Sequence, residues 1–220
     1  MERRGSLYDY RYSGQDRDCK ARLWQVLIAD FLQRFVQPSD TVLDLGAGDC
    51  EFINNVGCGR KIAVDTREDL TEAAADGVEC LTGGTDDLSK LEPDSVNVVF
   101  ASNFFEHLGS RDELLATLHE ARRVLVPAGK LLIIQPNYRY AYKVYFDFFD
   151  HHLPLSHGSM AEALAIAGFE IEELRPRFMP FTVKTAYPKH PLLVRVYLKL
   201  GFLQKLFGKQ MFVAAVKKEG

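Results

Sequence analysis

Residues 41–52, TVLDLGAGDCEF, decide the fold of this chain together with residues 62–65, IAVD. The apolar residues before the first glycine predict a buried strand, which turns at Gly46-Ala47-Gly48 and leads into a short helix. The second apolar run ends in Asp65, 17 residues after Gly48. Glycines let the backbone approach a ligand closely, and a carboxylate at a strand end can accept hydrogen bonds from both hydroxyls of a ribose. The two runs therefore predict half of a nucleoside-binding site.

Length and composition indicate one soluble α/β domain, because 220 residues with 47% apolar residues suffice for a single core. The N-terminal residues lack the apolar run of a signal peptide, and no run of 18 uncharged apolar residues predicts a spanning helix. The four cysteines show no CxxC spacing and no disulfide framework. We therefore expect a cytoplasmic protein with reduced thiols.

Strands and helices are predicted to alternate along most of the chain. The predicted strands cover residues 41–45, 61–65, 79–82, 95–102, 130–135, 169–174 and 210–216. The predicted helices cover residues 21–36, 49–56, 68–75, 111–125 and 159–167. This alternation predicts a doubly wound, mostly parallel, seven-stranded Rossmann-like α/β sheet. About 30 residues, rather than a helix of ordinary length, separate the last two strands, and we expect the last strand to be antiparallel.

The residues around the glycine turn bear on which nucleoside is bound. A dinucleotide fingerprint would need a third glycine where this chain has Glu51. Asp44 lies two residues before Gly46, where a carboxylate can order the turn or accept a hydrogen bond from a ligand ammonium group. S-adenosylmethionine carries such a group in its α-amino group, whereas a nicotinamide dinucleotide has no cation to place there.

Four motifs in order resemble those of class I S-adenosylmethionine-dependent methyltransferases, in the small-molecule group (type 11/23-like). VLDLGAGDCEF resembles the first motif, IAVD the second-strand acid, DSVNVVFASNFFEHL the fourth-strand motif and VLVPAGKLLIIQPN the fifth. The resemblance covers residues 41–169 and has two departures. Ala128 stands in place of a glycine after Pro127, and in the loop at residues 83–87, GGTDD, the acid of the usual G-D-A is a glycine or is displaced by one or two positions.

The resemblance implies a role for each matching residue. Gly46, Ala47 and Gly48 would pass under the methionine part of the cofactor, with Asp44 nearby. Asp65 would bind the ribose hydroxyls, and Thr66 would lie beside the adenine. The remaining implied contacts are Thr85 and Asp86 at the adenine edge, and Ser102 and Asn103 beside the sulfonium and the acceptor.

The histidines are the candidates for a catalytic base. Methyl transfer from a sulfonium is an in-line displacement, so positioning supplies most of the acceleration, and a base is needed only when a hydroxyl must lose its proton. The candidates are His107, which follows Glu106, and His151 and His152 in the connection after the fifth predicted strand. The alternative for His107 is that it only orders its loop. Some similar O-methyltransferases use a divalent ion, but no HxH or HExxH spacing is present, so we predict no metal site.

The C-terminal part of the chain differs from the rest in charge. Residues 181–220 contain eight Lys or Arg and one acid, whereas the first 180 residues contain 19 basic and 29 acidic residues. Residues 191–207 are apolar at helical spacing with basic residues between them, which leaves three explanations: burial in the body, contact with a membrane surface, or a homodimer contact. We therefore divide the chain into an N-terminal cap with the first helix (1–40), a methyltransferase domain (41–179 and 209–220) and a basic apolar helical insertion (180–208).

These observations predict a methyltransferase that moves a methyl group from S-adenosylmethionine to a small-molecule, glycan or lipid-linked acceptor, at oxygen. The alternatives are a nicotinamide-dependent oxidoreductase on the same kind of sheet, and a non-catalytic methyltransferase-like scaffold. A scaffold would have no use for Asp65. No nucleic acid partner is expected, because the basic segment lacks interleaved aromatic residues and the chain has no N-P-P-Y or paired-cysteine motif. The enzyme would be cytoplasmic, and peripheral to a membrane if residues 191–207 bind lipid.

Overall fold

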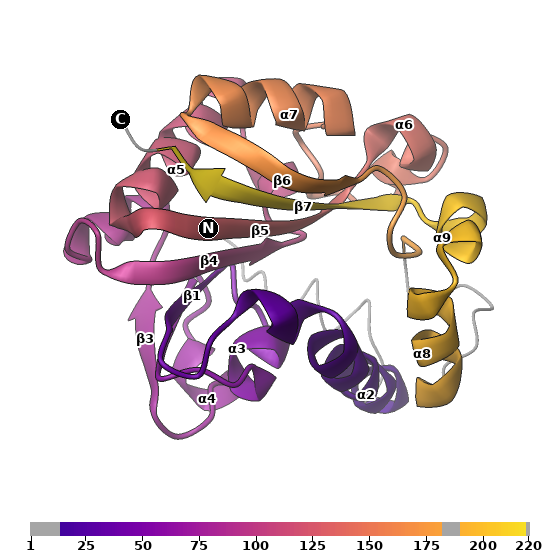
Figure 1. Cartoon of the computed structure of the whole chain (residues 1–220), viewed down its shortest axis with the longest axis horizontal. Coiled ribbons are helices and arrows are strands. Elements are labelled where there is room, and N and C mark those ends of the chain that lie inside the picture. Colours follow the sequence, from indigo (N-terminus) through magenta and orange to yellow (C-terminus); the bar gives the residue numbers. More distant parts are fainter. Residues whose placement is uncertain (1–13, 182–189, 219–220) are drawn as a thin grey trace.

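A computed structural model describes residues 14–181 and 190–218 and contains one seven-stranded sheet (Figure 1). The strand order is β3-β2-β1-β4-β5-β7-β6, and β7 runs antiparallel to both β5 and β6. The strands are β1 (Thr41–Leu45), β2 (Arg60–Asp65), β3 (Val78–Thr82), β4 (Val96–Ser102), β5 (Leu125–Pro136), β6 (Phe169–Arg175) and β7 (Gln210–Lys217). The predicted fold class, including the antiparallel last strand, is confirmed.

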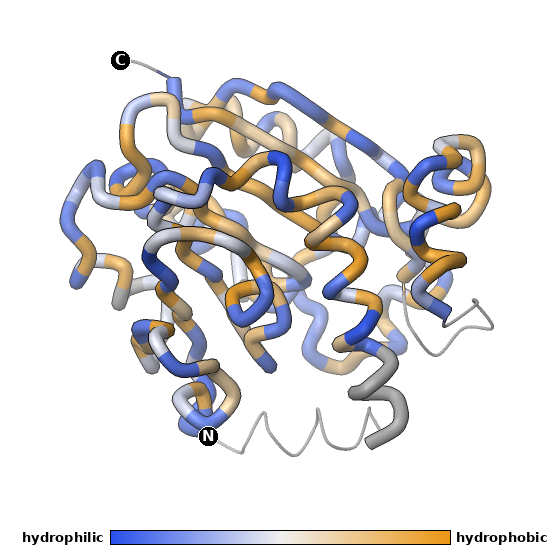
Figure 2. The backbone as a smooth tube through the Cα atoms, turned by 60° about the horizontal axis from the view of Figure 1, so that its bottom comes forward, coloured by the Kyte–Doolittle hydropathy of each residue, from blue (hydrophilic) through white to orange (hydrophobic). Residues whose placement is uncertain are grey.

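Helices cover both faces of the sheet. On one face lie α2 (Gly14–Asp30), the 3-10 turn η1 (Leu32–Phe35), α3 (Glu51–Asn55) and α4 (Leu70–Ala73). On the other lie the 3-10 turn η2 (Thr85–Lys90), α5 (Arg111–Val124) and α7 (His157–Ile166). Successive residues of a strand point to opposite faces of the sheet. Val42 therefore packs against the layer that contains α2, whereas Leu43 and Leu45 pack against the layer that contains α5. In Figure 2 hydrophobic residues accordingly run along the strands through the middle of the molecule.

The largest differences between predicted and observed boundaries are in the first helix and in β5. The first helix starts at Gly14 rather than at residue 21, and it ends at Asp30, before the separate turn η1. β5 begins at Leu125, five residues before the predicted start, because Leu125 already pairs with Val96. The register then shifts between Val96 and Val98, and Ala128 takes a left-handed φ of 59°. The predicted turn is therefore an irregularity within one strand.

The C-terminal insertion forms two helices instead of one, α8 (Pro191–Lys199) and α9 (Gly201–Phe207). α8 lies beside α2 (Figure 1), where the Arg195 guanidinium pairs with Asp30 at 3.1 Å and Val194 is buried. The Tyr197 hydroxyl donates to the Phe178 carbonyl at 2.7 Å. In the described residues, no helix is both long and apolar enough to cross a membrane.

Candidate active site

A cavity of about 430 Å³ opens where the strand order reverses, at the carboxyl ends of β1 and β4. Open α/β sheets bind their ligands at this position, because the connections from neighbouring strands leave in opposite directions there. α2 contributes Trp24 and Leu27 to its wall, and α8 contributes Val194 and Tyr197. Both the first helix and the insertion therefore close the cavity from the side.

The turn after β1 forms the floor of this cavity. Gly46 and Gly48 have φ values of +73° and +54°, in the left-handed region that favours glycine. A Cβ at Gly46 would lie 2.4 Å from Cδ2 of Phe104, so a side chain there would also collide with that ring. The N–H groups of Gly46 and Ala47 donate to the carbonyl of Val64 at 2.8 and 3.1 Å, which fixes the turn against β2.

Asp65 ends β2 beside this turn. Its Oδ2 accepts from the Gly48 N–H at 2.8 Å, and its Oδ1 accepts from the Arg67 N–H at 3.0 Å. Each carboxylate oxygen has two lone pairs, so both oxygens retain acceptor capacity for a ligand hydroxyl. The carboxylate is therefore oriented by the backbone before any ligand binds.

The other predicted cofactor residues also line the cavity, as far as their side chains are described: Asp44, Thr66, Thr85, Ser102 and Asn103. Burial raises the pKa of Asp44 well above its usual range, so a ligand cation beside it would favour its charged form. The Asn103 amide donates to the Ser102 hydroxyl at 3.1 Å and accepts from the Gln210 amide at 2.7 Å. The side chain of Asp86 lies outside the described part of the structure.

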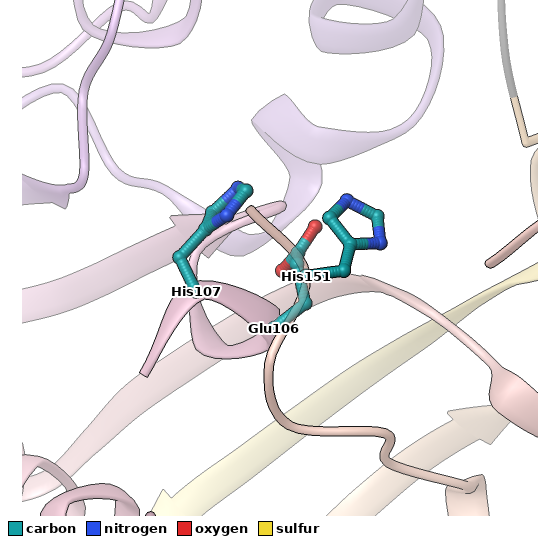
Figure 3. Close-up of side chains that lie close together, drawn as sticks. All are labelled: Glu106, His107 and His151. Atoms are coloured by element: carbon teal, nitrogen blue, oxygen red, sulfur yellow. The ribbon is translucent and has the colours of Figure 1, made fainter. Parts of the chain in front are cut away.

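A Glu–His–His cluster, formed by Glu106, His107 and His151, lies in the same cavity (Figure 3). Glu106 and His107 belong to the 3-10 turn η3 (Phe105–His107) after β4, and His151 belongs to the connection between β5 and α7. The two imidazole rings are 5.3 Å apart at their centroids and nearly perpendicular, at 74°. The cluster thus joins residues from two separate connections.

Glu106 is the most buried member of this cluster, with 1% of its surface exposed. Within the described residues, neither of its carboxylate oxygens forms a hydrogen bond. Burial raises the pKa of Glu106 to about 7, and nearby His107 and the Gln135 amide offset this only partly. The sequence does not distinguish Glu106 as a site residue, and its place in the E-H-L motif is the one signal that points to it.

His152, the third predicted catalytic residue, lies outside the cavity, because the chain turns its side chain to the surface. Its backbone N–H donates to the Glu106 carbonyl at 2.8 Å, so its main chain, rather than its imidazole, contacts the cluster. The structure therefore brings together His107 and His151, but not His152.

Comparison with known proteins gives a family match for part of the chain and structural matches for most of it. Residues 43–133 match the family model described as a methyltransferase domain. No curated protein matches the chain. The structure resembles a methyltransferase from a complex with the Trm112 methyltransferase activator of Haloferax volcanii, with 20% identity, coverage of 94% of this chain and 95% of that one, and a TM-score of 0.67.

Two further solved structures are similar. A SAM-dependent methyltransferase from Archaeoglobus fulgidus has 20% identity, coverage of 90% and 94%, and a TM-score of 0.67. Another, from Thermotoga maritima, has 18% identity, coverage of 93% and 94%, and a TM-score of 0.64. At this level of identity, these likenesses establish a shared fold over nearly the whole chain.

Proposed function

We propose that this chain transfers a methyl group from S-adenosylmethionine to an oxygen atom of its acceptor. The methyltransferase domain that residues 43–133 match identifies the chain as an S-adenosylmethionine-dependent methyltransferase. The family match confirms the predicted family and enzyme class, and with them S-adenosylmethionine as cofactor. The nicotinamide and scaffold alternatives are therefore set aside. What the acceptor is, and which of its atoms is methylated, is our proposal.

The cofactor would bind with its ribose at Asp65 and its ammonium group at Asp44. Asp65 lies at the end of β2 with both oxygens oriented by backbone N–H groups, and Asp44 is buried at the end of β1. The turn with Gly46 and Gly48 lies between the two carboxylates, so its backbone would run under the methionine part. This position would direct the sulfonium toward Ser102 and Asn103 at the end of β4.

The observation that carries the oxygen proposal is the Glu–His–His cluster in the same cavity. A neutral amine can attack the methyl group while it still holds its protons, whereas a hydroxyl must lose its proton as it attacks. The cluster supplies one carboxyl and two imidazole groups to the cavity that Asn103 also lines. We propose that it assists loss of that proton while the hydroxyl oxygen attacks the methyl carbon. The C–S bond breaks as the C–O bond forms, and S-adenosylhomocysteine is released.

A screen with methyl-labelled S-adenosylmethionine tests this proposal. Candidate acceptors would be offered as matched sets that differ only in a hydroxyl, amine or thiol at the same carbon. We expect label in methyl ethers or methyl esters, identified by mass spectrometry. Label found only on nitrogen, sulfur or carbon would contradict the oxygen proposal.

We also propose that the enzyme contacts an anionic membrane surface, where it would meet a lipid-linked or glycan-lipid acceptor. The support is a row of exposed apolar side chains on α8 and α9: Leu192, Leu193, Val196, Leu200, Phe202, Leu206 and Phe207. Phe202, with 63% of its surface exposed, is the most prominent, and Lys199 and Lys205 lie exposed among them. An apolar helix face flanked by lysines suits the boundary between acyl chains and anionic head groups. The alternative to membrane contact is that the enzyme stays in the cytoplasm away from the membrane and methylates a free small molecule.

Vesicle flotation distinguishes these possibilities. The full chain should float with vesicles that contain an anionic phospholipid and less with neutral vesicles. The double variant Leu192→Ser/Phe202→Ser should lose flotation, whereas Ile166→Ser, an exposed apolar residue on α7, should not. Equal recovery of all three proteins would contradict the membrane proposal, and a dimer that the double variant breaks would assign the same residues to a homodimer contact.

A further inference from the structure

We propose that the Glu–His–His cluster binds a divalent transition-metal ion, through one carboxylate oxygen of Glu106 and one ring nitrogen each of His107 and His151. Such an ion would hold the acceptor oxygen beside the methyl group, and this part of the inference rests on the proposed oxygen acceptor. The proposal departs from our expectation from the sequence, which was that no metal site exists.

The geometry of the three side chains is close to that of a metal site. One potential ligand atom from each residue lies within 4.8 Å of the other two. Figure 3 shows the Glu106 carboxylate between the two imidazole rings. Ligand atoms about 2.1 Å from a shared ion are roughly 3–4 Å apart, so small side-chain rotations suffice to complete the set. Two histidines and one carboxylate are a ligand set of catalytic zinc and non-haem iron sites, which leave positions open for substrate.

The second observation is the unsatisfied carboxylate of Glu106. It is 1% exposed, and its two oxygens have no hydrogen-bond partner in the described residues. A buried polar group without a partner is unfavourable and rare, and it usually marks a site where an unseen ligand completes the arrangement. The nearby Gln135 amide lowers the pKa of this carboxyl only in part, and its own side-chain atoms also have no hydrogen-bond partner among the described residues. A cation coordinated by Glu106 would compensate the buried carboxylate more fully.

The third observation concerns the orientation of His107. Its Nδ1 lies 2.8 Å from the carbonyl oxygen of Asp150. A carbonyl can only accept a hydrogen bond, so Nδ1 must carry the proton, and in the neutral ring the lone pair then belongs to Nε2. Histidines that bind metals are commonly oriented in this way, with the second nitrogen donating to a carbonyl or carboxylate.

His151 is held in place by aromatic neighbours. Its ring stacks on the ring of Phe148, with centroids 4.9 Å apart and planes at 13°. It also packs against the ring of Tyr145 in a T-shaped arrangement, with centroids 4.7 Å apart. The backbone N–H groups of His152 and Leu153 both donate to the Glu106 carbonyl, at 2.8 and 3.1 Å. These bonds attach the His151 connection to η3, so the three proposed ligands are fixed relative to one another although they come from two connections.

A bound divalent ion would lower the pKa of an acceptor hydroxyl that coordinates it. The hydroxyl proton would leave to solvent water, and the oxygen electron pair would form the new C–O bond. The C–S bond would break with its electrons remaining on sulfur, which yields S-adenosylhomocysteine. In this arrangement the histidines position the acceptor, and neither of them needs to take the proton.

Metal titration of the full chain tests the proposal without an acceptor. Chelator-treated protein would be titrated with Zn²⁺, Co²⁺ and Mn²⁺ by calorimetry, and Co²⁺ absorption would report coordination by nitrogen. We expect one ion per chain. Glu106→Gln, His107→Asn and His151→Asn should each weaken binding at least tenfold, while His119→Asn, an exposed histidine on α5, should bind as the wild type does.

Binding of S-adenosylhomocysteine by each variant would serve as the control for folding. No ion bound by the wild type at millimolar concentration, or cluster variants that bind it as tightly as the wild type, would overturn the metal proposal. Methyl transfer to a hydroxyl by chelated, ion-free protein would overturn the role of the ion while the oxygen proposal stands. An ion that binds at the cluster of an enzyme that labels only nitrogen would reject the oxygen acceptor while the site itself stands.

Discussion

The two halves of the cavity are built in different ways. The half proposed for the cofactor uses the ends of two adjacent strands, and its key carboxylate, Asp65, is already oriented by the N–H groups of Gly48 and Arg67. The half proposed for the acceptor takes Glu106 and His107 from one connection and His151 from another, and the two carboxylate oxygens of Glu106 have no hydrogen-bond partner among the described residues. Asp65 is oriented by backbone N–H groups before a ligand binds, whereas the Glu106 carboxylate is buried without a hydrogen-bond partner among the described residues. We therefore expect the residues around Asp65 to determine binding of the cofactor and the residues around Glu106 to determine binding of the acceptor.

The largest expected effect is on the cofactor half. Asp65→Ala should weaken binding of S-adenosylhomocysteine at least about 100-fold, because each hydrogen bond to a charged carboxylate contributes roughly 1.5–3 kcal/mol. Calorimetry measures this directly. Asp76→Ala, an exposed acid on the loop before β3, is the control and should bind normally. Unchanged affinity of Asp65→Ala would mean that Asp65 does not bind the ribose hydroxyls.

The second prediction tests whether the turn is rigid. Gly46→Ala should destabilise the protein by about 2–4 kcal/mol, because a positive φ costs a non-glycine residue and the new Cβ would collide with Phe104. Gly84→Ala, with a φ of −90° and open space around its Cβ, should change stability by less than about 0.5 kcal/mol. Urea unfolding of both variants checks the difference, and equal midpoints would show that the turn adapts.

The third prediction concerns pH and the acceptor half. Burial raises the pKa of Glu106 from 4.5 to about 7 in the folded protein, so between these values the folded state holds more protons than the unfolded state. Stability contributed by this group should therefore fall as pH rises from 4.5 to 7. In chelated protein, Glu106→Gln should match the wild type near pH 4.5 and exceed it by up to about 3 kcal/mol at pH 8.

Thermal unfolding of both proteins across this pH range measures that difference. A constant difference between wild type and Glu106→Gln would mean that Glu106 is not held in an unfavourable buried environment. Added metal ion should remove the advantage of the variant at pH 8, since the ion stabilises only the wild-type carboxylate.

The smallest expected effect compares two adjacent histidines. His151→Ala should reduce methyl transfer about tenfold or more, because His151 lines the cavity, whereas His152→Ala should change it less than twofold, because that side chain is exposed. Initial rates at saturating S-adenosylmethionine measure both. Equal losses would indicate that the connection as a whole, rather than one imidazole, serves the acceptor half.

The sequence predicts the cofactor half well because its signals are local. β1 has the predicted bounds, since a short apolar run followed by glycines leaves little freedom in where the strand ends. Asp44, Asp65 and the turn between them fall within about 20 residues, and parallel pairing of β1 and β2 brings them together. Strand and turn chemistry alone therefore places these residues.

The acceptor half could not be predicted in the same way because its contacts are between distant residues. Nothing in the sequence distinguishes His151 from His152. In the structure, the bonds from the 152–153 backbone to Glu106 and the aromatic rings around His151 place the His151 imidazole in the cavity. The burial of Glu106 likewise depends on packing between connections. The insertion forms two helices rather than one because the chain leaves helical geometry at Leu200, where φ is −101° and ψ is 85°.

Calorimetry with S-adenosylhomocysteine on the pair Asp65→Ala and Glu106→Gln tests most directly whether the two halves are separate. We expect Asp65→Ala to lose at least about 100-fold in affinity, whereas Glu106→Gln should bind within about threefold of the wild type. Comparable losses in both variants, with both proteins folded, would contradict the division of the cavity into a cofactor half and an acceptor half.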